Sequence, residues 1–324
     1  MSFDAGLLGR FLKGDKRACS RIISIVEDAR PHMAEYLEKL QAHTGRAHII
    51  GITGPPGVGK SSLINRLSTK YLECGKNVGV IAVDPSSPFS GGAVLGDRIR
   101  MGDISLNPKF YFRSMSSRGS LGGLSHATID ASRVLDAFGK DIIIIETVGT
   151  GQSEVDIMEA CDTVIVVTMP GTGDDIQAQK AGIMEIGNIF VINKSDRDGA
   201  ERTLREIQSM LMLNPMNADY EIPVVMTKSN VGEGIEKLID SIDAHYEYLK
   251  KTGRLSEKRS LRSVSVFEKK FLGELKSKIN SILLNDAEFL KIKENVAGGR
   301  MSPDSASIRI MEHIEKKMFN AAGK

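Results

Sequence analysis

Tryptophan is absent from this 324-residue chain, and aromatic residues of all kinds make up only 5% of it. Proteins that bind single-stranded nucleic acid stack the bases on aromatic side chains, so this scarcity argues against such a platform. The formal net charge is only +2, which gives no broad excess of positive charge to attract a polyanion. We therefore expect no nucleic-acid partner.

Closely spaced cysteines and long apolar runs are also missing. The three cysteines, Cys19, Cys74 and Cys161, form neither a CxC nor a CxxC pair, and unpaired thiols suit a reducing compartment. No apolar run approaches the roughly 18 residues that a membrane span requires. The first residues, MSFDAGLL, lack the charged start and the cleavage site of a signal peptide. We expect a cytoplasmic protein that has no membrane partner.

The central part of the chain predicts an α/β fold with a mostly parallel sheet flanked by helices. Residues 46–242 alternate apolar runs with helical patterns, and runs such as Ile142–Ile145 are continuous and β-branched, as in strands buried on both faces. The expected strands are 48–53, 78–84, 110–114, 141–146, 163–169, 188–193 and 222–227. Residues 1–45 and 243–324 are expected to be helical extensions, which serve self-association or partner docking, or simply support the core.

The most informative motif follows the first expected strand and fits the phosphate-binding pattern G-x-x-x-x-G-K-[S/T]. The motif consists of Gly54, Pro55, Pro56, Gly57, Val58, Gly59, Lys60 and Ser61. Ser62, which follows the motif directly, is also expected to belong to the nucleotide site. Glycines let the backbone wrap closely around an anion, with N–H groups that point at the α- and β-phosphates. Lys60 is expected to reach the β- and γ-phosphates, and the Ser61 hydroxyl to bind Mg²⁺ at the start of a helix. The motif therefore predicts a P-loop NTPase.

A second motif, N-K-x-D, predicts that the base is guanine. It follows an expected strand directly and consists of Asn193, Lys194, Ser195 and Asp196. The Asp196 carboxylate can accept hydrogen bonds from the ring N–H and the exocyclic amine of guanine, a donor pair that adenine lacks. We expect Asn193 to orient the loop and the Lys194 stem to cover the base. A backbone N–H that can meet the guanine O6 is expected where the last strand ends, at Thr227, Lys228 and Ser229.

Carboxylates between these motifs are candidates for Mg²⁺ binding and for switching. Glu146 ends an expected strand and precedes residues 147–149, Thr-Val-Gly, where the glycine permits a backbone N–H to approach the γ-phosphate. Asp84 and Asp97 are candidates for binding Mg²⁺ or positioning water. Alternatively, Asp84 is a cap beside Pro85 and Asp97 is a helix N-cap. No glutamine directly follows the glycine, so we predict slow intrinsic hydrolysis.

Together these residues resemble the MeaB/ArgK group of P-loop GTPases, the chaperones of methylmalonyl-CoA mutase. The resemblance extends over nearly the whole chain and is carried by Gly14–Ala18, Ile22–Glu27, Gly51–Leu67, Val83–Ser87, Gly96–Arg98, Arg113–Gly123, Ile145–Glu154, Pro170–Asp174 and Asn193–Asp196. The early Gly-Asp-Lys-Arg-Ala and the Glu-Thr-Val-Gly stretch are hard to explain by another family. One departure is Thr227-Lys228, where family members often carry Ser-Ala.

The resemblance implies a homodimer, assembled through the helical extensions, that binds GTP or GDP with Mg²⁺. It implies a chaperone that gates the loading of adenosylcobalamin into methylmalonyl-CoA mutase, or a related acyl-CoA mutase, and protects that enzyme from inactivation. By position, the Mg²⁺ and switch carboxylates of the family match Asp84, Asp97 and Glu146. The family's additional switch segment matches Asp174, Gln177 and Lys180. That segment meets the nucleotide when the mutase is bound, and would supply what the missing glutamine does not.

The main alternative is a metal-insertion GTPase that serves a metalloenzyme such as hydrogenase or urease. Such proteins usually carry histidine tracts or closely spaced cysteine and histidine ligands, whereas the six histidines here are scattered. Ligands that are distant in sequence can still converge across a dimer, so this alternative stays open. A module that holds GTP only as a structural ligand differs in kind, and phosphate release over many turnovers separates it from an enzyme. A targeting GTPase of the signal-recognition type lacks support, because the 14 methionines are dispersed.

Overall fold

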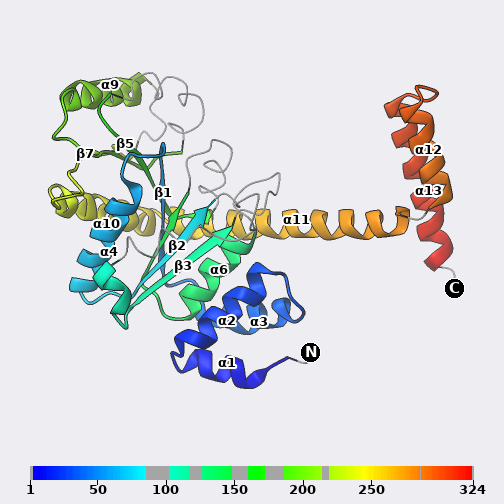
Figure 1. The fold of residues 1–324 in the computed structure, drawn as a ribbon, viewed down its shortest axis with the longest axis horizontal. Coiled ribbons are helices and arrows are strands. Elements are labelled where there is room, and N and C mark those ends of the chain that lie inside the picture. The colour runs from blue at the N-terminus through cyan, green and yellow to red at the C-terminus, as the bar shows by residue number, and fades with distance from the viewer. Residues whose placement is uncertain are drawn as a thin grey trace. The chain divides into compact units, whose positions relative to one another are not determined.

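The computed structural model describes residues 3–84, 102–116, 126–147, 160–171, 186–213, 219–284 and 286–322. Its centre is a seven-stranded sheet in the order β3-β2-β4-β1-β5-β6-β7, in which each pair of neighbours is parallel. The strands are β1 (His48–Thr53), β2 (Val78–Asp84), β3 (Phe110–Ser116), β4 (Ile142–Glu146), β5 (Thr163–Thr168), β6 (Ile189–Ile192) and β7 (Val224–Met226). Helices flank this sheet (Figure 1), so the predicted α/β class is confirmed.

The strands consist mainly of apolar, β-branched residues, as the sequence indicates. All six residues of β1 and all six of β5 are buried, which is typical of parallel strands that helices cover on both faces. β7 is shorter than the expected 222–227 and begins directly after Pro223. Proline has no N–H to donate to a sheet, which explains the later start. The Pro223 carbonyl still accepts a hydrogen bond of 2.9 Å from the Phe190 N–H.

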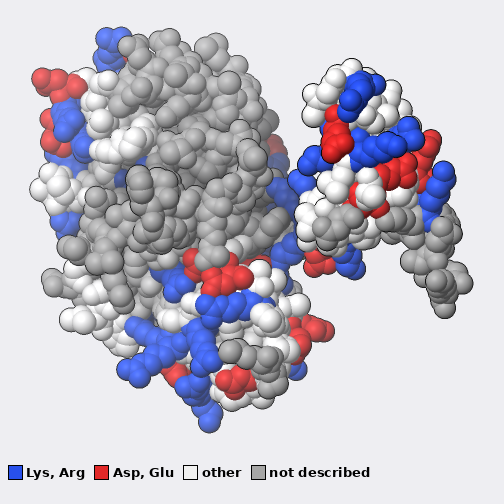
Figure 2. Space-filling model, turned by 45° about the vertical axis from the view of Figure 1, so that its right-hand side comes forward, with Lys and Arg blue, Asp and Glu red and all other residues white. Residues whose placement is uncertain are grey.

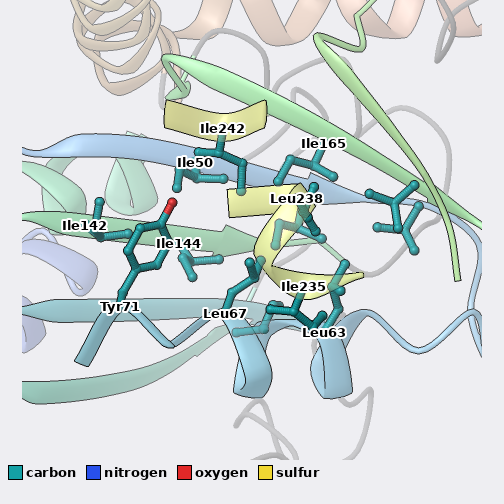
Figure 3. Close-up of a cluster of buried hydrophobic side chains, with 14 of the residues drawn as sticks. Ile50, Leu63, Leu67, Tyr71, Ile142, Ile144, Ile165, Ile235, Leu238 and Ile242 are labelled. Carbon is teal, nitrogen blue, oxygen red and sulfur yellow. The ribbon is translucent and has the colours of Figure 1, made fainter. Parts of the chain in front are cut away.

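One face of the sheet is covered by α4 (Lys60–Glu73) and α10 (Ile235–Lys251). Leu63 and Leu67 of α4 lie beside Ile235 and Leu238 of α10 and share one buried cluster with strand residues (Figure 3). The two helices therefore pack on each other as well as on the sheet.

The opposite face is covered by α6 (His126–Ala137) and α9 (Ala200–Leu213). Ile207 of α9 packs with Val166 of β5, whereas Ile165 and Val167 on either side belong to the cluster under α4 and α10. Successive side chains of a strand point to opposite faces, so α9 and α10 lie on different sides of the sheet.

The N-terminal helices α1 (Ala5–Leu12), α2 (Lys16–Glu27) and α3 (Met33–Leu40), with the 3-10 turn η1 (Gln41–His43), belong to the same compact unit as the sheet. α2 and α3 pack against α6. Figure 2 shows Lys and Arg side chains gathered in the part of the molecule where these helices lie, and their exposed basic residues include Arg10, Lys13, Arg17 and Arg21.

The early Gly-Asp-Lys-Arg-Ala stretch has a structural role. Gly14 follows α1 with φ +86°, a conformation that favours glycine. The Asp15 carboxylate accepts the N–H groups of Arg17 and Ala18 and so caps α2. The Lys16 ammonium donates to the carbonyl oxygens of Asn107 and Phe110 at 3.0 and 2.8 Å, next to the short 3-10 turn η2 (Gly102–Leu106). The motif thus ties α2 to the edge strand β3.

The chain divides into compact units at residues 262 and 263, whereas the sequence places the start of the helical extension at 243. The expected boundary falls inside α10, where Ile242, His245 and Leu249 are buried, so the helix continues as part of the core. The second unit holds the end of α11 (Arg254–Leu283), with α12 (Ala287–Ala297) and α13 (Pro303–Ala322), which pack against each other. Its exposed apolar residues include Phe267, Phe271, Leu272 and Ile308. Among the described helices, none is long and apolar enough to cross a membrane.

Candidate functional site

The phosphate-binding motif forms the loop between β1 and α4, and two of its glycines are required by close contacts. Gly54 has φ +141°, and a Cβ there would stand 2.0 Å from the Val167 carbonyl oxygen. Gly59 has φ +97°, and a Cβ there would stand 2.4 Å from Nδ2 of Asn193. Any larger residue would push the loop away from β5 or from the N-K-x-D segment. The glycine pattern therefore reflects contacts within the protein as well as access for a ligand.

The N-terminus of α4 presents its first N–H groups without a side-chain cap. Gly59 occupies the N-cap position and offers no side chain to accept from them. Such a helix terminus favours an anion, because its N–H groups and the helix dipole carry partial positive charge. The Lys60 ammonium is buried and donates to the carbonyl oxygens of Gly54 and Pro55 at 2.6 and 3.0 Å. The loop thus combines a fixed cation with a helix N-terminus, as phosphate binding requires.

Two of the expected Mg²⁺ ligands lie in direct contact. The Ser61 hydroxyl, in the first turn of α4, donates to Oε1 of Glu146 at 2.9 Å. Glu146 ends β4, opposite Ile52 of β1 and Ala82 of β2, so it lies at the carboxyl edge of the sheet. Hydroxyl and carboxylate oxygens are ligands that Mg²⁺ prefers, so this pair fits the ion. Asp84 ends the neighbouring strand β2, so its backbone lies at the same edge of the sheet. Its side chain lies outside the described part of the chain.

The loops expected to bind the base are joined to the phosphate loop through Asn193. Its side chain is fully buried and donates from Nδ2 to the Val58 carbonyl oxygen at 2.7 Å. Its Oδ1 accepts from the Thr227 hydroxyl and from the Ser229 N–H, each at 3.1 Å. One amide therefore connects the phosphate loop, the N-K-x-D segment and the end of β7, which agrees with the orienting role expected for Asn193.

Lys194 and Asp196 complete the N-K-x-D segment. Lys194 has φ +55°, an uncommon conformation for a residue with a side chain, and its ammonium donates to the Gly57 carbonyl oxygen at 2.6 Å. The Lys194 side chain therefore reaches from the N-K-x-D segment to the phosphate loop. Asp196 is exposed. The carboxylate that is expected to select the base is therefore open to solvent.

The sequence places Lys228 where a backbone N–H is expected to meet the guanine O6, but Lys228 bonds to Glu233 through its backbone and its side chain. Its N–H donates to the Glu233 carbonyl oxygen at 3.0 Å, and its ammonium pairs with the Glu233 carboxylate at 2.5 Å. The Lys228 N–H is therefore already bonded within the loop. Thr227 donates its N–H to the Ile192 carbonyl oxygen, and Ser229 donates its N–H to Asn193, so the N–H groups of all three residues have partners within the protein.

The remaining candidates cannot be placed. Asp97, Gln177 and Lys180, together with Asp174, lie outside the described residues. Where the structure describes the chain, no group of three or more His, Cys, Asp or Glu side chains is arranged to hold a metal ion.

A contact that the sequence patterns did not indicate joins the ends of β1 and β4. The Thr147 hydroxyl donates to the Thr53 hydroxyl at 3.1 Å, and both residues are buried. The bond links the residue before the phosphate loop to the residue after Glu146. The sequence shows only that Thr53 ends one apolar strand and that Thr147 follows another, which does not predict their pairing.

A second polar cluster lies at the opposite ends of β1 and β5, away from the phosphate loop. The buried Asp162 carboxylate accepts from Arg259 and Arg262 of α11, at 2.6 and 3.0 Å for the closest contacts. Burial alone would raise the pKa of Asp162, but the hydrogen bonds and charge of these arginines hold it below its ordinary value. The cluster anchors the start of α11 to the sheet.

Two histidines complete this cluster. His48 Nε2 lies 2.7 Å from the Thr163 hydroxyl, which lies 2.9 Å from Nδ1 of His245. Burial lowers the pKa of His48 to about 3 and that of His245 to about 4, because a charged imidazole would lose its hydration. Both rings are therefore neutral near pH 7, and their position at the far edge of the sheet gives them a structural role.

Several known proteins are similar to this chain over most of its length. The family described as Methylmalonyl Co-A mutase-associated GTPase MeaB matches residues 19–282. A putative GTPase of Pyrococcus abyssi is 46% identical over 311 residues, which cover 95% of this chain and 96% of the relative. GTPase ArgK of Escherichia coli is 31% identical, with 96% of each chain covered. The Caenorhabditis elegans protein named methylmalonic aciduria type A homolog, mitochondrial, is 32% identical, covering 93% of this chain and 80% of the relative.

A solved structure shares the fold. The crystal structure of an LAO/AO transport system kinase matches with a TM-score of 0.75, covering 97% of this chain and all of that chain at 23% identity. The glycine-constrained phosphate loop, the Ser61–Glu146 contact and the Asn193 bridge are thus found in a chain that matches one family over residues 19–282. Since relatives above 30% identity also cover nearly all of it, this chain belongs to the MeaB family of methylmalonyl-CoA mutase-associated GTPases.

Proposed function

We propose that this GTPase binds GTP and GDP with Mg²⁺ at the carboxyl edge of the sheet and acts as a chaperone of an adenosylcobalamin-dependent acyl-CoA mutase. The observation that carries the nucleotide part is the Asn193 amide, which bonds to Val58 of the phosphate loop and to Thr227 and Ser229 of the base loop. A single rigid connection between the phosphate-binding and base-binding segments is what a nucleotide that spans both requires.

The residues of the phosphate loop would hold the nucleotide by charge and by backbone donors. The N–H groups at the start of α4 would point at the phosphates, and the Lys60 ammonium would exchange its two carbonyl partners for β- and γ-phosphate oxygens. Asp196 would accept from guanine and exclude adenine. Binding would therefore depend on the phosphates and on the base together.

Ser61 and Glu146 would hold the Mg²⁺, with Asp84 and Asp97 as further candidates. Bound Mg²⁺ supplies positive charge next to the β- and γ-phosphates. Water attacks the γ-phosphorus as the bond to the bridging oxygen breaks, and Lys60 stabilises the charge that develops on the departing oxygen. No glutamine directly follows Gly149 to orient the water; Gln152 is three positions further on. Hydrolysis by the isolated protein is accordingly slow in this proposal.

The partner would complete the catalytic site. In this proposal, Gln177 and Lys180, in the segment that follows β5, meet the nucleotide when the mutase is bound and accelerate hydrolysis. The family to which the chain belongs and the C. elegans relative, whose name refers to methylmalonic aciduria, support a mutase as the client. The helical second unit, with exposed side chains such as Phe267 and Phe271, supports assembly of a homodimer. We propose a cytoplasmic location and the gating of adenosylcobalamin loading as the purpose of the GTPase cycle.

Steady-state phosphate release, with and without the adenosylcobalamin-dependent acyl-CoA mutase of the same host, tests this proposal. We expect slow GTP hydrolysis that the mutase accelerates about tenfold or more, with ATP as an inert control. If the mutase leaves the GTP rate unchanged, the chaperone assignment is wrong and only the GTPase remains. If ATP is hydrolysed as fast as GTP, the assignment of the base site is wrong.

A further inference from the structure

Arg66 contacts the loop of residues 227–234, which follows β7 and is expected to bind the base. Arg66 itself belongs to none of the nucleotide-binding motifs of this chain. It lies on α4, six residues after Lys60. Its Nε donates to the Ser229 carbonyl oxygen at 3.0 Å, and its Nη2 donates to the Asn230 carbonyl oxygen at 2.5 Å. One guanidinium therefore holds two successive carbonyls from a helix that is distant in sequence.

The packing of α4 on α10 explains why Arg66 reaches this loop. Leu63 and Leu67 of α4 share a buried cluster with Ile235 and Leu238, at the start of α10 (Figure 3). Because α10 begins directly after the loop of residues 227–234, this packing brings the loop beside the exposed side of α4. Arg66 lies between Leu63 and Leu67 in sequence and projects from that side.

The two ends of the loop are fixed without Arg66. At the first end, Asn193 accepts from the Ser229 N–H, and Lys228 pairs with Glu233 through its backbone and its side chain. At the other end, Gly234 has φ +78°, and a Cβ there would stand 2.2 Å from the Met226 carbonyl oxygen. Residues 229 and 230 lie between these anchors, and Arg66 holds the carbonyl oxygens of both.

The guanidinium sets the orientation of the peptide groups in this part of the loop. In a planar trans peptide the C=O and the following N–H point in opposite directions. When the Ser229 carbonyl points to Arg66, the Asn230 N–H points to the other side, and the Ser229 N–H is already directed at Asn193. Since the N–H groups of residues 227–229 have partners within the protein, the Asn230 N–H is the donor of this segment that Arg66 orients.

We infer that Arg66 is a positioning residue for base recognition, which holds the loop of residues 227–230 so that the Asn230 N–H meets the oxygen at position 6 of guanine. This inference rests on the proposed guanine-nucleotide site. Arg66 does not contact the phosphate loop or the nucleotide in this account; it acts through the Ser229 and Asn230 carbonyls. Because it extends from the same helix that begins at Lys60, it also keeps the distance between the phosphate-binding and base-binding parts constant.

The test compares GDP with two analogues in the full-length protein. In 6-thio-GDP sulfur, a weaker acceptor, replaces O6, whereas IDP keeps O6 and lacks the exocyclic amine that Asp196 is expected to bind. Dissociation constants and dissociation rates are measured for the wild type, Arg66→Ala and Arg66→Lys, with Mg²⁺ present. Lys70→Ala is the matched control, because Lys70 lies one turn further along α4 and pairs with Glu236 of α10 at 3.2 Å.

We expect Arg66→Ala to weaken GDP binding about 5- to 30-fold, mainly through faster dissociation. Its preference for GDP over 6-thio-GDP should fall towards one, while its preference for GDP over IDP stays within about twofold of wild type. Arg66→Lys should be intermediate, since an ammonium lacks the planar fork that fits two carbonyls. Lys70→Ala should behave as wild type.

Unchanged ratios in Arg66→Ala, or an equal loss of all three nucleotides, would overturn the inference, because neither effect is specific to O6. The same loss in Lys70→Ala would overturn it too, since the effect would then belong to helix contacts in general. If Arg66→Ala does not fold, the ratios of Arg66→Lys decide the question. A wild-type protein that binds none of the three nucleotides would instead contradict the proposed function itself.

Discussion

At the scale of single residues, Lys60 and Asn193 connect parts of the site that are far apart in the sequence. Lys60 closes the phosphate loop on itself through Gly54 and Pro55, and Asn193 joins that loop to the end of β7. Each side chain is buried and hydrogen-bonded within the protein, so each is held in place before a ligand arrives. Such preorganisation lowers the entropy that binding has to overcome.

Replacing Lys60 by alanine tests the phosphate loop. The change removes a cation that would bind two phosphate oxygens, and hydrogen bonds to charged groups contribute about 1.5–3 kcal/mol each. We expect affinity for GTP to fall by about 100-fold or more, as measured by titration calorimetry. Lys76→Ala, a substitution after the end of the same helix, is the control. Wild-type affinity in Lys60→Ala would contradict the assigned role.

Replacing Asp196 by asparagine tests the choice of base. The amide keeps the size of the carboxylate but cannot accept from both guanine donors, so the preference for GTP over ATP should fall by about 1–3 kcal/mol. Competition binding with the two nucleotides measures this preference. Asp198→Asn, two residues further along, should leave it unchanged. A wild-type ratio in Asp196→Asn would show that another residue selects the base.

The site residues that could be predicted from sequence are those that lie in short contiguous motifs. Gly54, Ser61 and Asn193 occupy fixed positions relative to strand ends, and in a parallel sheet those ends meet at one edge. Arg66 could not be predicted, because its partners Ser229 and Asn230 are more than 160 residues away and no local pattern marks the contact.

At the scale of secondary-structure elements, the start of α11 is anchored to the sheet by a buried polar cluster. Asp162 accepts from Arg259 and Arg262, and Arg259 also donates to the carbonyl oxygens of Gly45 and Ala47 at 2.6 and 2.7 Å. These carbonyls precede β1, and Asp162 precedes β5. The cluster therefore fixes one helix and two strands at the edge opposite the phosphate loop.

Because two buried histidines belong to this cluster, we expect the folded protein to lose stability in acid. The pKa of His48 is lowered to about 3 and that of His245 to about 4, so the folded protein binds these protons less readily than the unfolded chain. Their full contribution to stability is present above the ordinary histidine pKa of about 6.5 and is lost as pH falls below it. In that range each histidine lowers the free energy of unfolding by up to about 1.4 kcal/mol for each unit by which the pH falls.

Urea unfolding at pH 7.5 and pH 5 measures this effect in the wild type and in His48→Gln. The groups that face His48 are Thr163, His245, Tyr246, Asp162, Arg259 and Lys250. The variant should lose less stability between the two pH values than the wild type, because glutamine does not titrate. The exposed His43, replaced by glutamine, should show the wild-type change. Equal pH dependence in all three proteins would contradict the account.

Element types were predicted more reliably than element ends. Buried, β-branched runs such as Ile142–Ile145 identify strands because few other arrangements bury every residue. The sequence places the end of the core domain at 242, within α10, although Ile242 and Leu249 of that helix are both buried. The amphipathic pattern of α10 continues without a break, so nothing in the sequence distinguishes these two positions. The division after Arg262 follows from contacts of α11 with Asp162, which sequence patterns do not reveal.

At the scale of the whole molecule, the account depends on how a partner changes the GTPase. Gln177 and Lys180 lie outside the described residues. Their assignment rests on the position that they share with the family's additional switch. A functional measurement is therefore the direct way to examine them.

Replacing Lys180 by alanine tests the role of the partner. We expect the ratio of mutase-stimulated to basal GTP hydrolysis to fall from about tenfold or more to about one, because the variant lacks the cation that this segment would bring to the nucleotide. Phosphate release at saturating mutase measures the ratio. Lys237→Ala, a change in α10, should keep the wild-type ratio. If Lys180→Ala is stimulated as strongly as the wild type, this residue does not belong to the switch.

The most direct test of the central claim is a calorimetric titration of the full-length protein with GDP and with ADP in the presence of Mg²⁺. The claim is that the phosphate loop and the loops joined to it through Asn193 form one guanine-nucleotide site. It predicts one GDP per chain, bound at least about 100-fold more tightly than ADP. Equal affinities for the two nucleotides, or tighter binding of ADP, would contradict it.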